Sequence, residues 1–243
     1  MIRLLCVMVV IVPWTIYLTL EILWHLYTKS ARLDCVCKAV PRRWSRVLLR
    51  AAGVRVVAEN AEGLARDAPQ ILVSNHVSWF DVLAICVATP GRIYFVSKKE
   101  VRRAPFLGKS IEVCGHIFID RSDRKAALDT LVGLRERLAK EKPIIIMFPE
   151  GTRSDTGELQ SFRKGAFVLA LQAGADVVPA AVLGSRAVMR KHSLLIHPGT
   201  ITVRFGEPIA VAGMTMEGRD QLMLDSREAV ARLLAAPATP PSE

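Results

Sequence analysis

Residues 70–85 read QILVSNHVSWFDVLAI, and this stretch decides the fold. Its first five residues indicate a buried strand, and residues 82–85 indicate the start of an apolar helix. Asp81 falls in the first turn of that helix, where the helix dipole favours a carboxylate. Because α/β proteins place their chemistry between a strand and the helix that follows it, the stretch predicts an α/β fold with functional residues at positions 75–81.

His76 and Asp81 are the candidate catalytic pair within this stretch. Positions five apart do not share one helix face, so His76 must reach Asp81 from the preceding loop. A carboxylate that accepts a hydrogen bond from one ring nitrogen fixes the histidine tautomer and leaves the other nitrogen free to take a proton from a hydroxyl. The alternative is a turn in which His76 and Asp81 are neighbours by chance.

A second cluster, IIIMFPEGTRS, occupies residues 144–154. Its apolar run is too short for most helices and ends in a Pro-x-Gly turn, which predicts a central strand and its loop. The guanidinium of Arg153 suits a planar, two-pronged grip on phosphate, and Gly151 lets the backbone approach a ligand closely. The alternative is a polar surface turn with a solvated Arg153.

Two further blocks follow the same plan: GHIFIDR at residues 115–121 and VVPAAV at residues 177–182. The four ordered blocks, NHx4D, GxxFIDR, FPEGTRS and VVP, resemble those of the glycerolipid acyltransferases. The chain is most similar to the 1-acylglycerol-3-phosphate acyltransferase branch of that family. The resemblance covers most of the chain beyond about residue 55, and four blocks in order are a far more specific signal than one.

The resemblance implies transfer of a fatty acyl group from acyl-CoA or acyl carrier protein to the free hydroxyl of lysophosphatidic acid, which gives phosphatidic acid in phospholipid synthesis. His76 would be the general base, and Asp81 would orient it. A backbone amide of the 149–151 turn, or one at the helix start, would hold the oxyanion. No metal and no cofactor are implied beyond the donor. The substrate-binding residues implied are Glu150, Gly151, Thr152, Arg153, Arg121, Lys98 and Lys99.

Three competing interpretations remain open. The acceptor can be another lyso-lipid, such as a lyso-ornithine lipid or a lysophospholipid, with the same chemistry at His76 and Asp81. A thioesterase would use water as acceptor, which leaves the phosphate-gripping block at residues 150–153 without a purpose. A basic membrane-surface scaffold would explain the charge of the chain, but it leaves four polar blocks at strand ends unexplained.

Composition limits the class of protein. The chain has 243 residues, enough for one sizeable α/β domain with an appendage. Its apolar content of 51% and mean hydropathy of +0.29 fit a membrane-attached globular enzyme. The net charge of +10 suits anionic lipid headgroups, a phosphorylated ligand or nucleic acid. The sequence has no zinc-finger spacing or recognisable helix-turn-helix pattern, which argues against nucleic acid as a partner.

The cysteines indicate a reducing compartment. There are five, an odd number without paired spacing, which argues against a disulfide framework. We expect Cys35 and Cys37 to be interfacial or buried thiols. The five positions are Cys6, Cys35, Cys37, Cys86 and Cys114.

The N-terminal segment predicts attachment to a membrane. Residues 4–20 carry no charge, Glu21 interrupts the run, and the apolar character continues to Tyr27. With Pro13 in its middle, the segment can span as one kinked helix or dip into one leaflet as a broken helix or helix pair. A secretory signal peptide is disfavoured, because Arg3 is the only charge before the apolar run and no clean cleavage site follows it.

A basic stretch follows the apolar segment. Positive charge marks the cytoplasmic flank of a membrane segment and attracts anionic lipids. We therefore expect the catalytic domain on the cytoplasmic side, at a bacterial inner membrane; the alternative is a solvated helix face. The basic residues are Lys29, Arg32, Lys38, Arg42, Arg43, Arg46, Arg50 and Arg55.

The remaining pattern alternates strands and helices, which predicts a mostly parallel sheet flanked by helices, with the N-terminal helical segment at the membrane. The expected domains are a membrane anchor with its basic segment at residues 1–50, an acyltransferase domain at residues 51–236 and a disordered tail at residues 237–243. The expected strands lie at residues 54–57, 71–74, 93–96, 144–148, 177–182 and 200–205, and the expected helices at residues 123–140 and 219–235.

Overall fold

The computed structural model describes residues 2–64, 68–104, 107–119 and 135–237. Its helices are α1 (Ile2–Tyr27), α2 (Leu33–Ala52), α3 (Phe80–Ala88), α4 (Leu107–Val113), α6 (Arg135–Glu141), α7 (Gly165–Ala173), α8 (Ser185–Val188) and α9 (Arg219–Ala235), with a 3-10 turn, η3 (Met216–Gly218), before α9. Its strands are β1 (Val54–Glu59), β2 (Gln70–Ser74), β3 (Ile93–Lys98), β4 (Ile117–Ile119), β5 (Ile144–Met147), β6 (Asp176–Leu183) and β7 (Gly199–Phe205).

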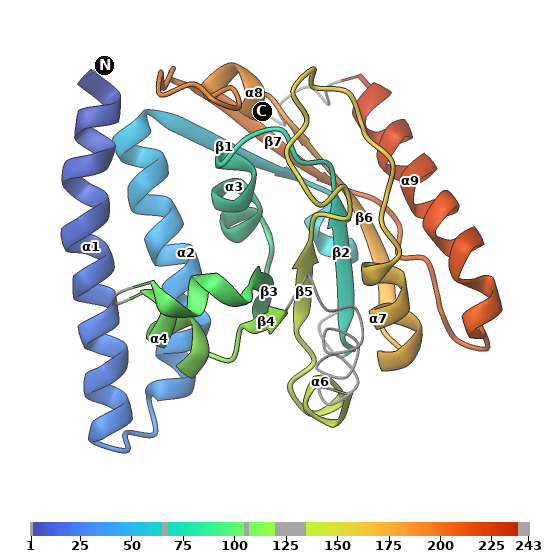
Figure 1. The fold of residues 1–243 in the computed structure, drawn as a ribbon, viewed down its shortest axis with the longest axis horizontal. Coiled ribbons are helices and arrows are strands. Elements are labelled where there is room, and N and C mark those ends of the chain that lie inside the picture. The colour runs from blue at the N-terminus through green and yellow to red at the C-terminus, as the bar shows by residue number, and fades with distance from the viewer. Residues whose placement is uncertain (1, 65–67, 105–106, 120–134, 238–243) are drawn as a thin grey trace.

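The seven strands form one sheet in the order β1-β7-β6-β2-β5-β3-β4 (Figure 1). All neighbouring pairs are parallel except β6 and β7, which are antiparallel. The prediction of a mostly parallel sheet flanked by helices is therefore confirmed. The two most central strands that carry polar blocks, β2 and β5, are direct neighbours, with Val73 opposite Met147 at their carboxyl ends.

Alternation along the strands divides the core into two layers. On β2, Leu72 packs with α2 and α3 on one face of the sheet, whereas Ile71 and Val73 pack with α7 and α9 on the other. A parallel strand covered on both faces is apolar throughout, and all five residues of β2 are buried. This explains why the 70–74 run shows no polar alternation.

The helices α1 and α2 form an antiparallel pair along one side of the molecule (Figure 1). The inner side of α1 is bonded to the body at several levels. Arg3 donates to the Ala52 carbonyl (3.3 Å), and Thr19 accepts a hydrogen bond from Ser110 of α4 (2.9 Å). Between them along α1, Thr15 accepts from the Trp44 indole (2.9 Å). A fourth tie, further along the helix, is the Arg43–Glu21 ion pair at 2.8 Å.

A disulfide joins Cys37 of α2 to Cys114 at the end of α4. The prediction that Cys37 is a free thiol is therefore wrong. The two cysteines are 77 residues apart in sequence, and only the packing of α4 against the α1–α2 pair brings them together, so local spacing gives no sign of the bond. Cys6 and Cys35 are exposed thiols, and Cys86 is a buried one.

Other expectations fall partly outside the described residues. The helix expected at residues 123–140 is described only as α6, and the tail at residues 238–243 lies beyond the described range. The expected strands are all present, and α9 begins and ends where predicted. The N-terminal segment is a single helix with Pro13 inside it, long and apolar enough to cross a membrane.

His116 lies just before β4, with its ring between β3 side chains. Its Nδ1 accepts a hydrogen bond from the Phe95 amide (3.1 Å), and its ring meets that of Tyr94 edge-on at 5.9 Å. Burial, together with the charge of Arg137, lowers the pKa of His116 from 6.5 to about 4. The imidazole is therefore neutral in the folded protein near neutral pH.

We predict that His116 makes the protein acid-sensitive. A histidine whose pKa is lowered on folding contributes stability that is complete above its unfolded pKa of 6.5 and is lost as pH falls toward about 4. The upper limit of the loss is roughly 3 kcal/mol of unfolding free energy. His116→Asn, which keeps an acceptor for Phe95, should flatten the pH dependence of the melting temperature between these values. His197→Asn, at an exposed site, is the control and should leave the dependence unchanged.

Candidate active site

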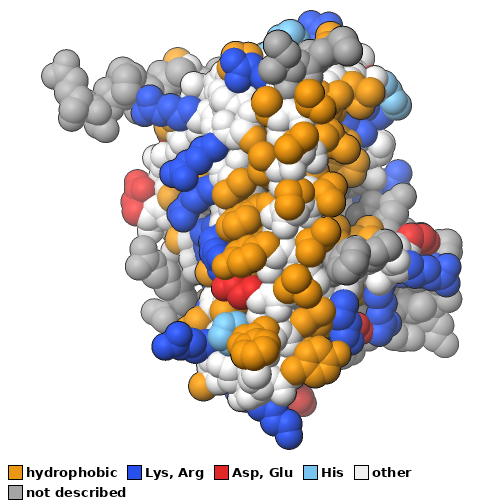
Figure 2. Space-filling view, turned by 90° about the vertical axis from the view of Figure 1, so that its left-hand side faces the viewer, with side chains coloured by type: hydrophobic (Ala, Val, Ile, Leu, Met, Phe, Trp, Pro, Cys, Tyr) orange, Lys and Arg blue, Asp and Glu red, His pale blue; other side chains and the backbone are white. Residues whose placement is uncertain are grey.

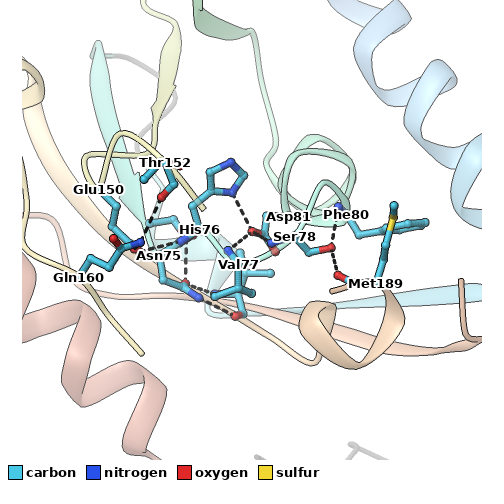
Figure 3. Close-up of polar contacts among 12 residues, drawn as sticks. Asn75, His76, Val77, Ser78, Phe80, Asp81, Glu150, Thr152, Gln160 and Met189 are labelled. Atoms are coloured by element: carbon cyan, nitrogen blue, oxygen red, sulfur yellow. Dashed lines mark hydrogen bonds and ion pairs between the residues drawn. The ribbon is translucent and has the colours of Figure 1, made fainter. Parts of the chain in front are cut away.

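The site lies at the carboxyl ends of β2 and β5, where two polar loops meet (Figure 3). The first loop runs from Asn75 to the start of α3, and the second follows β5 through residues 148–154. Asn75 fixes the first loop to β6. Its side chain donates to the Val182 carbonyl (3.0 Å) and accepts from the Val182 amide (2.8 Å). Asn75 thus extends the β2–β6 pairing by one residue into the loop.

His76 and Asp81 are in direct contact, as predicted. Nδ1 of His76 lies 2.8 Å from Oδ2 of Asp81, and the second ring nitrogen points away from the carboxylate (Figure 3). Asp81 is fully buried, and His76 is largely so but borders a cavity. With Oδ2 accepting, the proton of the neutral ring is on Nδ1, which leaves Nε2 as the basic atom.

Asp81 holds the loop as well as the histidine. The same Oδ2 accepts hydrogen bonds from the amides of Val77 (2.7 Å) and Ser78 (2.8 Å). Three donors on one carboxylate oxygen are a strong, charge-assisted arrangement. These bonds wrap residues 76–78 around the first turn of α3. The His76 ring is thereby placed beside the carboxylate of Asp81, which comes five positions later in the sequence.

The second loop fixes the backbone of His76 from the other side. Glu150 accepts a hydrogen bond from the His76 amide (2.8 Å), and the Ser154 amide donates to the His76 carbonyl (2.8 Å). The ring of Phe148 stacks on the imidazole, with centroids 4.1 Å apart. His76 is thus positioned by contacts to its amide, its carbonyl and its ring before any substrate binds.

Glu150 is buried and does not line the cavity, unlike the three residues after it. Its second oxygen accepts a hydrogen bond from Gln160 (2.9 Å), which also donates to the Thr152 carbonyl (3.3 Å). Burial raises the pKa of the Glu150 carboxyl, and the hydrogen bonds that it accepts from the His76 amide and from Gln160 oppose the rise. A substrate contact by Glu150 stays a prediction, whereas the geometry gives it a positioning contact to His76. Sequence reasoning missed Gln160, which no motif marks.

Gly151, Thr152 and Arg153 line the cavity beside His76, as expected of substrate-binding residues. The guanidinium of Arg153 stacks over the ring of Trp79 at 4.8 Å. Trp79 is 61% exposed and sits one residue before α3, so it forms the rim of the cavity. This cation–π contact supports the guanidinium at the rim of the cavity, where it can meet an anionic ligand. Sequence reasoning also missed Trp79, although its place between His76 and Asp81 was a signal.

The other predicted phosphate contacts are less well placed. Lys98 ends β3, and its side chain lies outside the described part of the chain; exposed Lys99, which follows it, is not among the residues that line the cavity. Arg121 lies outside the described residues. The Gly151 amide, in the turn proposed for the oxyanion, donates to the Phe148 carbonyl (3.0 Å). Within the described ranges, no cluster of three or more His, Cys, Asp or Glu could hold a metal ion.

The cavity has a volume of about 560 Å³ and extends from His76 toward the N-terminal helices. Its inner wall is apolar, and burial there raises the pKa of the Cys86 thiol to about 12, so this cysteine is uncharged. One end is therefore polar, with His76 and Arg153, and the other suits a hydrocarbon chain. Representative apolar residues are Leu18, Ile22, Val40, Leu107, Ile111 and Ile146.

The sequence of the chain is similar to those of known proteins. Residues 55–183 match the Acyltransferase family model. The chain is 36% identical over 172 residues to the 1-acyl-sn-glycerol-3-phosphate acyltransferase of Saccharomyces cerevisiae, covering 70% of this chain and 56% of that one. It is 34% identical over 164 residues to the enzyme of that name from Cocos nucifera, covering 68% and 53%. The chain thus spans little more than half the length of these two relatives.

A solved structure has the same fold. The 1-acyl-sn-glycerophosphate (LPA) acyltransferase PlsC from Thermotoga maritima superimposes with a TM-score of 0.79 at 24% sequence identity, and the match covers 98% of this chain and 97% of that one. The N-terminal helices are thus part of the shared architecture. Since the family model spans more than half of the chain and includes the loops of His76, Asp81 and Arg153, the protein belongs to the acyltransferase family.

Proposed function

We propose that the protein transfers a fatty acyl group from a thioester to the free hydroxyl of lysophosphatidic acid and so forms phosphatidic acid. The observation that carries the proposal is the 2.8 Å contact between His76 Nδ1 and Asp81 Oδ2, with Nε2 turned away from the carboxylate at the polar end of a cavity that has an apolar inner wall. The names of the similar curated proteins support the same acceptor.

In the proposed reaction, His76 Nε2 takes the proton of the acceptor hydroxyl as its oxygen attacks the thioester carbonyl. A carbon–oxygen bond forms, the carbon–sulfur bond of the tetrahedral intermediate breaks, and the thiolate takes the proton back from His76. Asp81 stabilises the imidazolium between these two transfers. The substrate hydroxyl takes the place that serine has in a hydrolase triad, so no enzyme nucleophile is needed.

The two ends of the cavity would divide the substrates by chemistry. Arg153, backed by Trp79, would bind the phosphate of the acceptor, with Thr152 and Gly151 shaping the loop around it. The apolar wall would hold an acyl chain. The donor would be acyl-CoA or acyl carrier protein, and neither a metal nor a resident cofactor takes part in the proposal.

We also propose that α1 lies in one leaflet of a membrane. Its most exposed side chains from Leu5 to Tyr27 are apolar, and Figure 2 shows this stripe with Lys and Arg side chains along its border. Because its inner side is bonded to the body at several levels from Arg3 to Glu21, the helix cannot cross a bilayer without taking charged α2 residues with it. Exposed Arg46 and Arg50 of α2 would meet anionic headgroups, with the body on the cytoplasmic side.

The location can be tested directly. A reporter enzyme that is active only in the cytoplasm, fused after residue 243, should be active, and one active only outside the cytoplasm should not. Washing membranes with high salt should leave the protein bound, because the α1 stripe is apolar and screening weakens only the charge contacts. The opposite reporter result would reverse the proposed orientation.

The catalytic pair is tested by His76→Ala and Asp81→Asn. Loss of a general base typically lowers turnover by roughly 10²- to 10⁴-fold. Asparagine is the better change at Asp81, because alanine would leave the buried Val77 and Ser78 amides without an acceptor. Acyl transfer to lysophosphatidic acid should fall in both variants while the melting temperature shows that they fold. Wild-type turnover by folded His76→Ala protein would rule out the mechanism.

Substitution of Arg153 distinguishes between the possible acceptors. Loss of a hydrogen bond to a charged group costs about 1.5–3 kcal/mol, or roughly ten- to a hundredfold. Arg153→Ala should therefore raise KM for lysophosphatidic acid far more than KM for the acyl donor, and Arg153→Lys should rescue only partly because it lacks the fork. An equal rise for both substrates would mean that Arg153 only shapes the loop. Wild-type activity confined to an acceptor without phosphate, such as lyso-ornithine lipid, would replace the proposed substrate.

A further inference from the structure

The connection between α8 and β7, residues 189–198, presents two adjacent leucines to solvent. Leu194 is 69% exposed and Leu195 is 51% exposed, while the next residue, Ile196, is buried in the core. Single exposed apolar residues are common on protein surfaces, whereas two large adjacent ones form a small apolar patch of the kind that marks interaction sites. We call this segment the dileucine loop.

The dileucine loop is held in shape by its own hydrogen bonds. The Ser193 amide donates to the Arg190 carbonyl (3.2 Å), and the Leu195 amide donates to the Ser193 hydroxyl (3.0 Å). At its base, the His197 amide donates to the Val188 carbonyl (2.9 Å). The leucines are therefore displayed by a closed turn with a buried anchor, so little ordering entropy would be lost if they were inserted into an apolar phase.

The loop lies beside the first turn of α1. Gly53, which caps α2, lies beside both Arg3 of α1 and Pro198 at the end of the loop, since a Cβ added there would meet the Arg3 side chain and lie 3.4 Å from Pro198. The Gly199 amide also donates to the Gly53 carbonyl (3.3 Å). Figure 1 shows the α8 connection and the N-terminal end of α1 at the same end of the molecule. The base of the loop therefore lies at the end of the molecule where α1 begins.

The loop also borders the active site. The Met189 carbonyl accepts a hydrogen bond from the Ser78 hydroxyl (2.8 Å), three residues before Asp81 (Figure 3). Lys191 pairs with Asp155 at 2.7 Å, two residues after Arg153. The rim of the cavity and the dileucine loop are thus one connected surface.

The charge of the loop favours an anionic lipid surface. Arg190, Lys191 and His192 precede the leucines, with Ser193 between, and residues 189–198 contain no acidic residue. Lys191 and His192 both face Asp155, which leaves Arg190 as the cation available to a ligand. The Arg190 side chain has no ion-pair partner among the described residues. Cations beside an exposed apolar pair match the headgroup layer and the acyl layer of a bilayer with anionic lipids.

From these contacts we propose that the dileucine loop is a second membrane contact, in which Leu194 and Leu195 enter the acyl layer of an anionic bilayer and Arg190 meets the headgroups. Together with α1 it would hold the mouth of the cavity against the lipid surface, where the acceptor resides. The inference rests on the membrane attachment in the proposed function. A protein partner for the same leucines is the alternative outcome.

Site-directed fluorescence tests this contact without reference to activity. In a Cys6→Ser/Cys35→Ser background, which removes the exposed thiols, an environment-sensitive dye is placed at Leu194→Cys, Tyr17→Cys or Met214→Cys. The full chain is reconstituted on vesicles of phosphatidylcholine and phosphatidylglycerol. Met214 precedes α9, which lies at the side of the molecule opposite to α1 (Figure 1), and is the exposed control.

We expect vesicles to shield the dye at positions 194 and 17 from aqueous iodide, with the dye at position 214 still quenched. If position 17 is shielded but position 194 is quenched as strongly as position 214, the loop does not enter the membrane and the proposal is overturned. If neither position is shielded, the proposed attachment by α1 fails as well. Acyl transfer, measured separately, decides the proposed chemistry in every case.

Acyl transfer provides the second test. Leu194→Asp/Leu195→Asp should lower kcat/KM about tenfold or more for lysophosphatidic acid embedded in vesicles, and should leave it unchanged for a short-chain, water-soluble acceptor. The matched variant Met214→Asp/Met216→Asp, at residues 42% and 43% exposed, should match the wild type on both. An equal loss on the soluble acceptor would mean that the loop only shapes the site, and this result would count against membrane insertion.

Discussion

One carboxylate oxygen organises the candidate active site. Oδ2 of Asp81 accepts hydrogen bonds from two loop amides and from the His76 ring, so loop shape and ring orientation are fixed by the same atom. This arrangement needs a strand that ends near the first turn of a helix, and the apolar β2 and α3 provide it. The remaining contacts to His76, from Glu150, Ser154 and Phe148, come from the neighbouring strand and depend on the β2–β5 pairing.

Much of the fold follows from local pattern. Buried parallel strands are continuous apolar runs, and the amphipathic α9 shows its period in the sequence, so these elements were predictable within a few residues. Contacts between distant elements were not. The Cys37–Cys114 bond depends on how α4 packs against the N-terminal helices, and no spacing rule contains that information. The position of β7 between β1, to which it is parallel, and β6, to which it is antiparallel, is likewise a matter of sheet order, which a single sequence does not reveal.

The residues of the candidate site were likewise predictable only in part. His76 and Asp81 were predictable because both lie in one short segment whose chemistry needs both side chains. Glu150 was found by its motif, but its contact to the His76 amide depends on the register of two strands. Gln160 and Trp79 act through geometry alone, one as a second donor to Glu150 and the other as a flat support for Arg153. Gln160 lies in none of the four blocks, whereas Trp79 lies inside the NHx4D block and is marked only by its place between His76 and Asp81.

The bonds along the inner side of α1 have a consequence for the bilayer as a whole. Under the proposed membrane attachment, a helix tied to its own domain from Arg3 to Glu21 would reach only the near leaflet. Under the proposed function, each turnover converts a single-chain lipid into a two-chain lipid on that side alone. The near leaflet would gain area while the far leaflet gains none, which creates bending stress. Relief of that stress would require the movement of lipids between the leaflets.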